Sequence, residues 1–272
     1  MSYGLRVIDS GPQPASLNMA TDEAILLGFI HGLSPPTLRF YSFSPPAMTL
    51  GRLQQPSEAL LSRAFDLGLS VVRRPTGGRA VIHDGDLTYS IVASTKCPDL
   101  GGGVVDTYRK ISEKLAAAFC NMGLDVSIEP PQRRCRYQRS ASCFDAAVGH
   151  ELIVGGEKIA GSAQVRQSGA FLQQGSITLI RPRYDFRQLF GKMSRAPRGL
   201  SSLVGRGLTY QEVMLAVRDS FRCSSRSDSL NEFETAKRDE LVLKYVSVQW
   251  NEFWGNAGLS RAYECSQSQI RC

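Results

Sequence analysis

Apolar residues recur at the spacing of amphipathic helices in five stretches of the chain. These stretches are residues 20–30, 57–67, 105–122, 209–221 and 231–246. Ser16 or Asn18 is placed to cap the first helix, with Asp22 and Glu23 near its positive end. Gly123 directly follows the longest stretch and is suited to end that helix. The pattern therefore predicts several helices of ordinary length.

Shorter apolar runs, separated by glycine and proline, predict the strands. The predicted strands are residues 5–9, 37–41, 48–51, 69–72, 87–92, 125–128, 151–154, 157–160 and 171–180. Residues 87–92 alternate between apolar and polar, which predicts a strand with one buried face. Pro45-Pro46 predicts a hairpin turn between two strands, and Gly155-Gly156 predicts a tighter one. Irregular alternation with the helices favours an α+β fold, in which a mixed, mostly antiparallel sheet is packed with helices.

The composition is that of a globular protein, and the sequence shows neither a membrane-spanning segment nor a signal peptide. The chain has 272 residues, of which 42% are hydrophobic and 21% are charged. We expect one main domain over residues 1–205 and a helical C-terminal extension over residues 206–272. The apolar run at 24–30 is too short to cross a bilayer, and the first residues lack a signal-peptide pattern. We therefore expect a cytoplasmic protein without a membrane partner.

The cysteines give little support to a metal site or a disulfide framework. Seven cysteines are scattered along the chain without a CxxC pair, and only three histidines accompany them. Structural zinc sites need closely spaced cysteine or histidine ligands, and disulfide frameworks belong mainly to small secreted domains. Most of these cysteines are expected to be reduced and to act as small hydrophobic residues.

The net charge of +7 favours association with acidic partners. The arginines are not interleaved with aromatic residues along one helix, and no nucleic-acid-binding motif is present, so we expect no nucleic-acid partner. The densest basic cluster, residues 133–139, is either a solvated loop or a docking patch for an acidic protein. The charge alone does not choose between these two readings.

The most informative segment for function is residues 73–84, with the sequence RRPTGGRAVIHD. The paired glycines Gly77 and Gly78 let the backbone approach a ligand closely or adopt a positive φ. Arg73 and its neighbouring arginines favour an anionic or carbonyl-bearing ligand. His83 either lines such a site or has a structural role. From these residues alone, a hairpin turn with solvated arginines is the alternative.

Three motifs resemble the lipoate-protein ligase and octanoyltransferase family. They are residues 36–51, the loop 73–84, and residues 156–164 with the sequence GEKIAGSAQ, and they occur in the family's order. The resemblance implies an acyl-handling domain related to biotin ligases, with residues 1–205 as the catalytic domain. It assigns acyl binding to the loop, with Arg73, Gly77, Gly78 and His83 as substrate-binding residues. It also identifies residues 156–164 as the family's lysine motif.

Cys143 is the candidate nucleophile, and Lys158 is its candidate catalytic partner. By pattern alone, Cys143 also fits a buried core cysteine, and Lys158 also fits a solvated turn residue. The octanoyltransferases of the LipM type place a Cys-Phe pair some fifteen positions before the lysine. This chain resembles them, because Cys143 is followed by Phe144 and stands fifteen positions before Lys158. A nearby ammonium favours the thiolate, the reactive form of a thiol whose unperturbed pKa is about 8.5.

The resemblance to that branch implies a protein octanoyltransferase of lipoate biosynthesis. The octanoyl group would pass from octanoyl-acyl carrier protein to Cys143 as a thioester. It would then pass to a lysine of a lipoyl-domain protein, such as the glycine cleavage H protein. The donor thioester is already activated, so this reaction needs no nucleotide, metal or other cofactor. The alternatives are an ATP-dependent lipoate-protein ligase acting through an acyl adenylate, a biotin ligase, and a carrier-binding module without chemistry.

Overall fold

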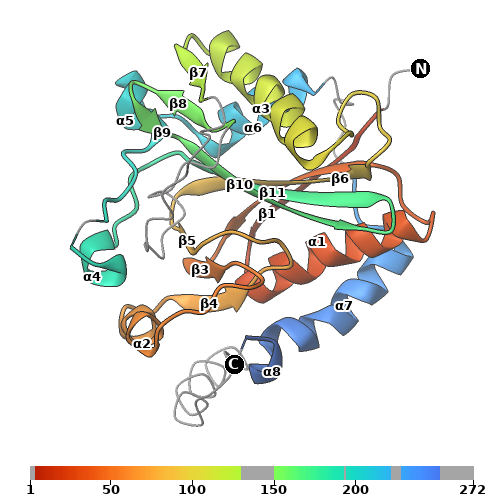
Figure 1. Cartoon of the computed structure of the whole chain (residues 1–272), viewed down its shortest axis with the longest axis horizontal. Helices are drawn as coiled ribbons and strands as arrows, with labels where there is room; N and C mark the ends of the chain where they lie inside the picture. Colours follow the sequence, from red (N-terminus) through yellow and green to blue (C-terminus); the bar gives the residue numbers. More distant parts are fainter. Residues whose placement is uncertain (1–3, 130–149, 193, 222–227, 252–272) are drawn as a thin grey trace.

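A five-stranded sheet forms the centre of the molecule, and helices cover both of its faces (Figure 1). The computed structural model describes residues 4–129, 150–192, 194–221 and 228–251. The strands lie in the order β1 (Arg6–Gln13), β2 (Thr37–Phe43), β6 (Asp86–Ser94), β11 (Ala170–Thr178) and β10 (Ala160–Gln167). Strands β1 and β2 are parallel, and the other neighbours are antiparallel. The predicted α+β class with a mixed, mostly antiparallel sheet is confirmed.

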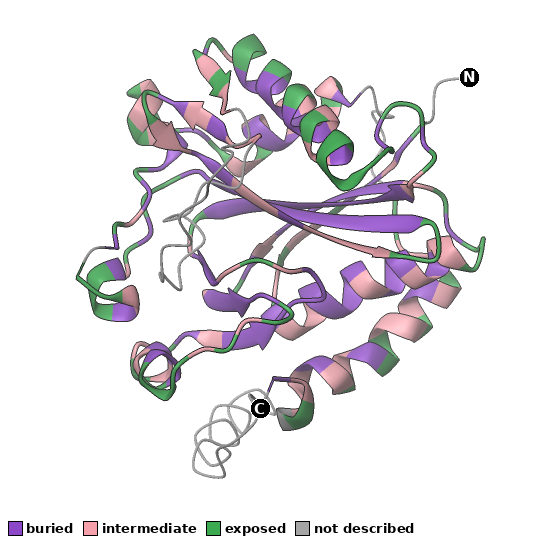
Figure 2. Ribbon diagram, viewed as in Figure 1, coloured by how far each residue is buried: buried purple, intermediate pink, exposed green. Residues whose placement is uncertain are grey.

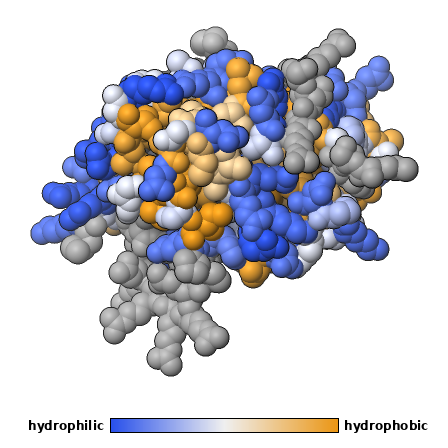
Figure 3. Space-filling view, turned by 90° about the horizontal axis from the view of Figure 1, so that it is seen from above, coloured by the Kyte–Doolittle hydropathy of each residue, from blue (hydrophilic) through white to orange (hydrophobic). Residues whose placement is uncertain are grey.

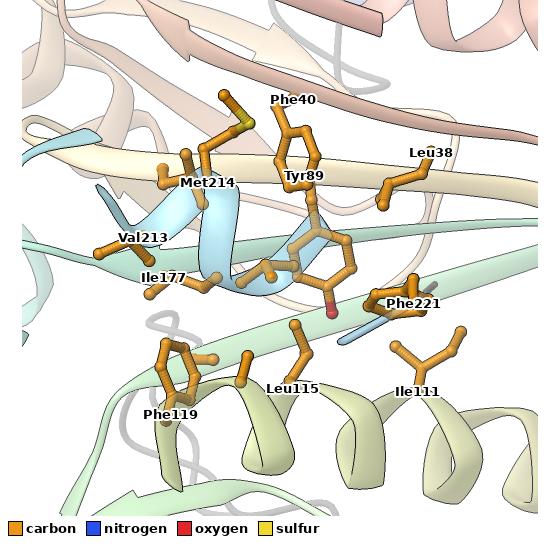
Figure 4. Packing of buried hydrophobic residues seen from close by; sticks show 14 of the residues in the cluster. Leu38, Phe40, Tyr89, Ile111, Leu115, Phe119, Ile177, Val213, Met214 and Phe221 are labelled. Atoms are coloured by element: carbon orange, nitrogen blue, oxygen red, sulfur yellow. The ribbon is translucent and has the colours of Figure 1, made fainter. Parts of the chain in front are cut away.

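Both faces of the central strand β6 are buried, whereas its alternating sequence predicted only one buried face. Leu87, Tyr89 and Ile91 pack against α3 (Val104–Asn121) and α6 (Tyr210–Ser220), as Figure 4 shows for the core on that side. The polar residues Thr88 and Ser90 are buried on the opposite face, where they form hydrogen bonds. The prediction failed because the polar residues of this strand face a buried polar site instead of solvent.

Helix α1 (Ala15–Ile30) lies on the second face of the sheet, and α7 (Glu232–Val246) covers its outer side (Figure 1). Figure 2 shows the result, because α1 is mostly buried while the outer side of α7 is exposed. The predicted caps of α1 are wrong, since the N-cap is Pro14 and no side chain caps the helix. The side chain of Asn18 donates instead to the backbone oxygens of Gln13 and Ser42.

A second, three-stranded sheet has the order β4 (Ser70–Arg73), β3 (Ala47–Leu50) and β5 (Val81–His83). Helices α2 (Glu58–Asp66) and α4 (Phe186–Phe190) share its hydrophobic cluster. The predicted hairpin across Pro45-Pro46 is therefore wrong, because β2 and β3 belong to different sheets. Both edges of β2 are occupied by β1 and β6, so β3 pairs with β4 and β5.

A third sheet consists of β7 (Val126–Ile128), β8 (Leu152–Val154) and β9 (Glu157–Lys158). The predicted turn between β8 and β9 is confirmed, and both of its residues have positive φ, 55° at Gly155 and 77° at Gly156. The chain then passes through buried Ile159 directly into β10 of the central sheet. The lysine motif thus joins two sheets.

The C-terminal helices pack against the central layers. Helix α6 contributes Val213 and Val217 to the same core as the central sheet, and α7 contributes Leu241 to the cluster around α1. The remaining short helices are α5 (Leu200–Val204) and α8 (Val248–Asn251). A domain division at residue 205 stays a prediction. Among the described helices, we find none with the length and hydrophobicity that a membrane crossing requires.

Candidate active site

A small cavity, partly open to solvent, lies where the central and second sheets meet. Strands of both sheets contribute to it, together with α1. Its apolar and small side chains include Met19, Phe43, Val81, Gly161 and Ala163. The small residues come from the lysine motif, as expected for a segment that leaves room for a ligand.

His83 lines this cavity and is held by contacts on both of its nitrogens. Its Nδ1 lies 2.7 Å from Asp86 Oδ2, and its Nε2 lies 2.9 Å from Thr49 Oγ1. The ring stacks on Phe43 with a centroid separation of 3.9 Å. Arg74 Nη1 donates to Thr49 Oγ1 at 3.1 Å, so these polar side chains form a continuous chain along the wall. The imidazole is therefore fixed in position and orientation.

Asp86 anchors this chain of contacts. Burial alone would favour its neutral form, but the neighbouring His83 and hydrogen bonds from Ser176 and Thr88 outweigh that effect. Together they hold the pKa of the Asp86 carboxyl below its ordinary value. Asp86 is therefore a charged carboxylate that contacts His83 Nδ1.

Replacing Asp86 with asparagine is expected to lower the free energy of unfolding by about 1–3 kcal/mol near neutral pH. Because the folded-state pKa of Asp86 is depressed, its contribution is complete above the unfolded pKa of about 3.9 and is lost as the pH falls through the folded value. The difference between wild type and variant should therefore shrink in acid. Urea unfolding at pH 7, 5 and 3.5 measures it, with exposed Asp99→Asn as the control. A difference independent of pH would contradict this account.

The two arginines that open the loop point to different places. Arg73 Nη1 donates to the carbonyls of Gly51, Arg52 and Gln54 at 2.6–3.1 Å, and Arg73 is not among the described residues that line the cavity. Burial and the adjacent Arg52 lower the pKa of Arg73 to about 10. Arg74, which was not among the residues assigned to substrate binding, lines the cavity. The role of Arg73 in substrate binding stays a prediction. In the structure its side chain holds the segment 51–54 through three carbonyl groups.

Of the two glycines, the structure requires Gly78, where an added Cβ would lie 2.8 Å from Arg74 Nη2, whereas a Cβ on Gly77 would meet nothing within 4 Å. Gly78 has a φ of 89°, and a Cβ atom on Gly51 would overlap the carbonyl oxygen of Gly78. Arg74 Nη2 donates to the carbonyl of Gly77 at 2.7 Å and to that of Arg79 at 2.8 Å. The loop is therefore folded around the Arg74 guanidinium beside the cavity.

Lys158 lies two residues before β10, the strand that supplies Gly161 and Ala163 to the cavity wall. Its Nζ donates to Glu151 Oε1 at 2.5 Å, and the two side chains are only 10% and 11% exposed. Lys158 is thus a nearly buried, paired cation rather than a solvated turn residue. Cys143 and the basic cluster 133–139 lie outside the described residues, and the roles assigned to them stay predictions.

A buried polar network behind the cavity went unnoticed in the sequence. Asp22 of α1 forms an ion pair with Arg39 of β2 at 2.7 Å, and neither side chain is exposed. The Asp22 carboxylate also accepts hydrogen bonds from Tyr41, Ser90 and Gln174 at 2.7–2.8 Å. The prediction that Asp22 and Glu23 lie near the positive end of the helix is wrong, because they are in the middle of α1 and its first turn holds no acidic residue.

This network reaches both the cavity and the glycine loop. Tyr41 and Gln174 line the cavity, and burial together with Asp22 raises the pKa of Tyr41 well above its ordinary value. Gln174 Oε1 accepts a hydrogen bond from Thr76 of the loop at 2.7 Å. The network therefore links α1, the central sheet and the loop.

Comparison with known proteins places these features among acyl-handling enzymes. A family model described as the lipoyl protein ligase A/B catalytic domain matches residues 14–222. The octanoyltransferase LipM of Moorella thermoacetica is 37% identical over 263 residues, which cover 90% of this chain and 96% of that protein. The octanoyltransferase LipM of Bacillus subtilis is 34% identical over 270 residues, with coverage of 90% and 97%.

The solved structures show the same similarity. A crystal structure of lipoate-protein ligase A bound with ATP is 25% identical to this chain and has a TM-score of 0.70. The match covers 91% of this chain and 98% of that one. The arrangement of sheets and helices described above is therefore shared along nearly the whole of both chains.

Proposed function

Because the chain belongs to the lipoyl protein ligase A/B catalytic domain family, we propose that it is a protein octanoyltransferase of lipoate biosynthesis. The observation that carries the proposal is the similarity to octanoyltransferases along nearly the full length of both chains. The cavity supports it, since apolar and small side chains suit an alkyl chain and polar groups gather at one wall. We take octanoyl-acyl carrier protein as the donor.

In the first step, the Cys143 thiolate attacks the carbonyl carbon of the donor thioester. A tetrahedral intermediate forms and then collapses, which breaks the bond to the carrier's sulfur and leaves an octanoyl thioester on Cys143. The carrier leaves as a thiolate that takes up a proton. Backbone N–H groups of the Gly77-Gly78 loop or the Lys158 region are the candidate donors to the oxyanion.

Lys158 supports the thiolate electrostatically in this proposal. Its ion pair with Glu151 holds the side chain in a nearly buried position. A buried cation favours the thiolate over the thiol far more than a solvated cation does, because water screens it little. Glu151 then holds the cation in position rather than taking part in the acyl transfer.

In the second step, the amine of an acceptor lysine attacks the thioester on Cys143 and forms an amide. The Cys143 sulfur leaves, and the amine loses a proton. The acceptor is a lipoyl-domain protein, such as the glycine cleavage H protein. Passing the acyl group through the enzyme divides a transfer between two proteins into two simpler substitutions.

An ATP-dependent lipoate-protein ligase is the second candidate, favoured by the fold match to a ligase bound with ATP. Such an enzyme activates a free acid as an adenylate and does not need Cys143. The higher identity to octanoyltransferases favours the transferase.

Intact-protein mass spectrometry separates the two functions. Wild-type protein is mixed with octanoyl-acyl carrier protein without ATP, and we expect it to gain the mass of one octanoyl group. Hydroxylamine should remove that group, because thioesters are labile to it. Acylation of a lipoyl domain that occurs only with free acid and ATP would reject the transferase in favour of the ligase.

A further inference from the structure

The segment between β11 and α5 carries most of the protein's net charge. Residues 181–198 contain six basic side chains and one acidic side chain, a net charge of +5 against +7 for the whole chain. The basic residues, all of them exposed, are Arg181, Arg183, Arg187, Lys192, Arg195 and Arg198. We call residues 181–198 the basic segment. It is a separate feature from the cluster at 133–139.

The basic segment is fixed to the fold by its apolar residues. Phe186 and Leu189 of α4 are buried in the hydrophobic cluster that also contains residues of α2 and the second sheet. Arg63 of α2 donates to the carbonyl of Leu189 at 3.2 Å. Asp185, the acidic residue, accepts from the Arg187 backbone at the start of α4. The backbone of the segment is therefore held against the hydrophobic cluster, and its basic side chains are exposed to solvent.

One end of the segment lies beside the candidate active site. The backbone N–H of Arg183 donates to Asp84 Oδ2 at 2.9 Å, and its guanidinium lies 3.3 Å from Asp84 Oδ1. Asp84 directly follows His83, which lines the cavity. Ile180, just before the segment, donates its N–H to Gly85 at 3.2 Å. The start of the basic segment is therefore held next to the residues that follow His83 in the chain.

The positive charge of the segment is largely uncompensated. Within the part of the chain that the structure describes, Arg183 is the member of the segment that forms an ion pair. The left-hand edge of Figure 3, which is the α4 and α5 end of Figure 1, is lined by hydrophilic side chains. Like charges gathered on one segment repel one another, and an acidic partner would relieve that repulsion.

The kind of side chain favours an acidic protein. Five of the six cations are arginines, whose planar forks donate two parallel hydrogen bonds to a carboxylate. Single-stranded nucleic acids are bound by aromatic side chains on which bases stack, beside a basic groove. The aromatic residues of the segment do not provide that, because Phe186 is buried and Tyr184 and Phe190 pack against the cluster.

We propose that the basic segment is the docking surface for the acidic carrier protein that delivers the acyl thioester. The inference rests on the proposed function. Docking there would place the carrier beside the His83 edge of the cavity, so that its acyl chain has a short path to the site. Because attraction between exposed charges acts over about 10 Å at 0.1 M salt, the effect should depend on ionic strength.

The test is the rate of acyl-enzyme formation with two donors. One donor is octanoyl-acyl carrier protein, and the other is the small neutral thioester octanoyl-N-acetylcysteamine. The variant combines Arg187→Glu, Lys192→Glu and Arg195→Glu. The matched control combines Arg109→Glu, Lys237→Glu and Arg238→Glu on α3 and α7, so that the net charge changes equally.

The docking variant is expected to lose about 10- to 100-fold in kcat/KM with the carrier protein at low salt. Its rate with the small thioester should stay at the wild-type value, and added salt should slow the wild type toward the variant. The control variant should lose much less with the carrier protein.

Equal losses in both variants, or equal losses with both donors, would overturn the docking surface. Unchanged carrier kinetics with lost binding to a short single-stranded oligonucleotide would overturn it in favour of nucleic acid. Failure of wild type with both donors would reject the proposed function itself, and this result differs from all of the others.

Discussion

Replacement of Cys143 by alanine is expected to abolish the octanoyl-enzyme and to slow octanoyl transfer by on the order of 10³- to 10⁶-fold. The variant lacks the sulfur that carries the acyl group, so the two-step route is closed. Any residual transfer would require direct attack by the acceptor amine on the donor thioester. Intact-protein mass spectrometry measures the adduct, and transfer to a lipoyl domain measures the rate.

The chain provides a matched control for this substitution. Cys120 is a free, exposed cysteine on α3, and Cys120→Ala should leave both the adduct and the rate unchanged. Cys143→Ser should form little or no acyl-enzyme, because a serine hydroxyl needs a stronger base than a thiol does. If Cys143→Ala still acquires a hydroxylamine-labile octanoyl group, another cysteine is the nucleophile.

Replacement of Arg39 by methionine is expected to lower the free energy of unfolding by about 3–5 kcal/mol. The ion pair with Asp22 is fully buried, so the substitution leaves a carboxylate without its cation in a region that water does not reach. The substitution also removes hydrogen bonds from Arg39 to Asn18 and Ser10. Urea or thermal unfolding near neutral pH measures the loss.

A double variant shows how much of the loss in stability comes from the unpaired Asp22 carboxylate and how much from the lost packing of the Arg39 side chain. Asp22→Asn combined with Arg39→Met removes the carboxylate but keeps an amide oxygen for Tyr41, so it should recover part of the loss. Arg109→Met, at an exposed ion pair on α3, should change stability by no more than about 0.5 kcal/mol. A loss of that small size for Arg39→Met would mean that the network is not structural.

Elements set by local chemistry could be predicted, and pairings set by distant partners could not. The helix predicted at 105–122 is found at Val104–Asn121, because its apolar positions repeat and a glycine ends it. The Gly155-Gly156 turn is also found, since few other residues adopt positive φ twice in a row. Nothing near Ala47–Leu50 shows that β2 already has two neighbours, so the sheet that β3 joins was unpredictable.

The candidate site shows the same division. The sequence identified the loop 73–84, and the loop does border the cavity through Arg74, Val81 and His83. It did not show which arginine faces the cavity, because adjacent residues at a strand end point in opposite directions. The partners of Asp22 were equally hidden, since they come from three separate strands, β2, β6 and β11.

The outer edge of strand β4 is covered by two side chains from α8, and this has a consequence for the order of assembly. Asn251 Oδ1 accepts from the Arg73 N–H at 2.8 Å, and Trp250 Nε1 donates to the Arg73 carbonyl at 2.9 Å. Two side chains thus stand in for a neighbouring strand at an edge of the second sheet. Arg73 and Asn251 are 178 positions apart, so a chain emerging from the ribosome exposes this edge until α8 is made. During synthesis, the strand that leads into the glycine loop is therefore open to pairing with another nascent chain.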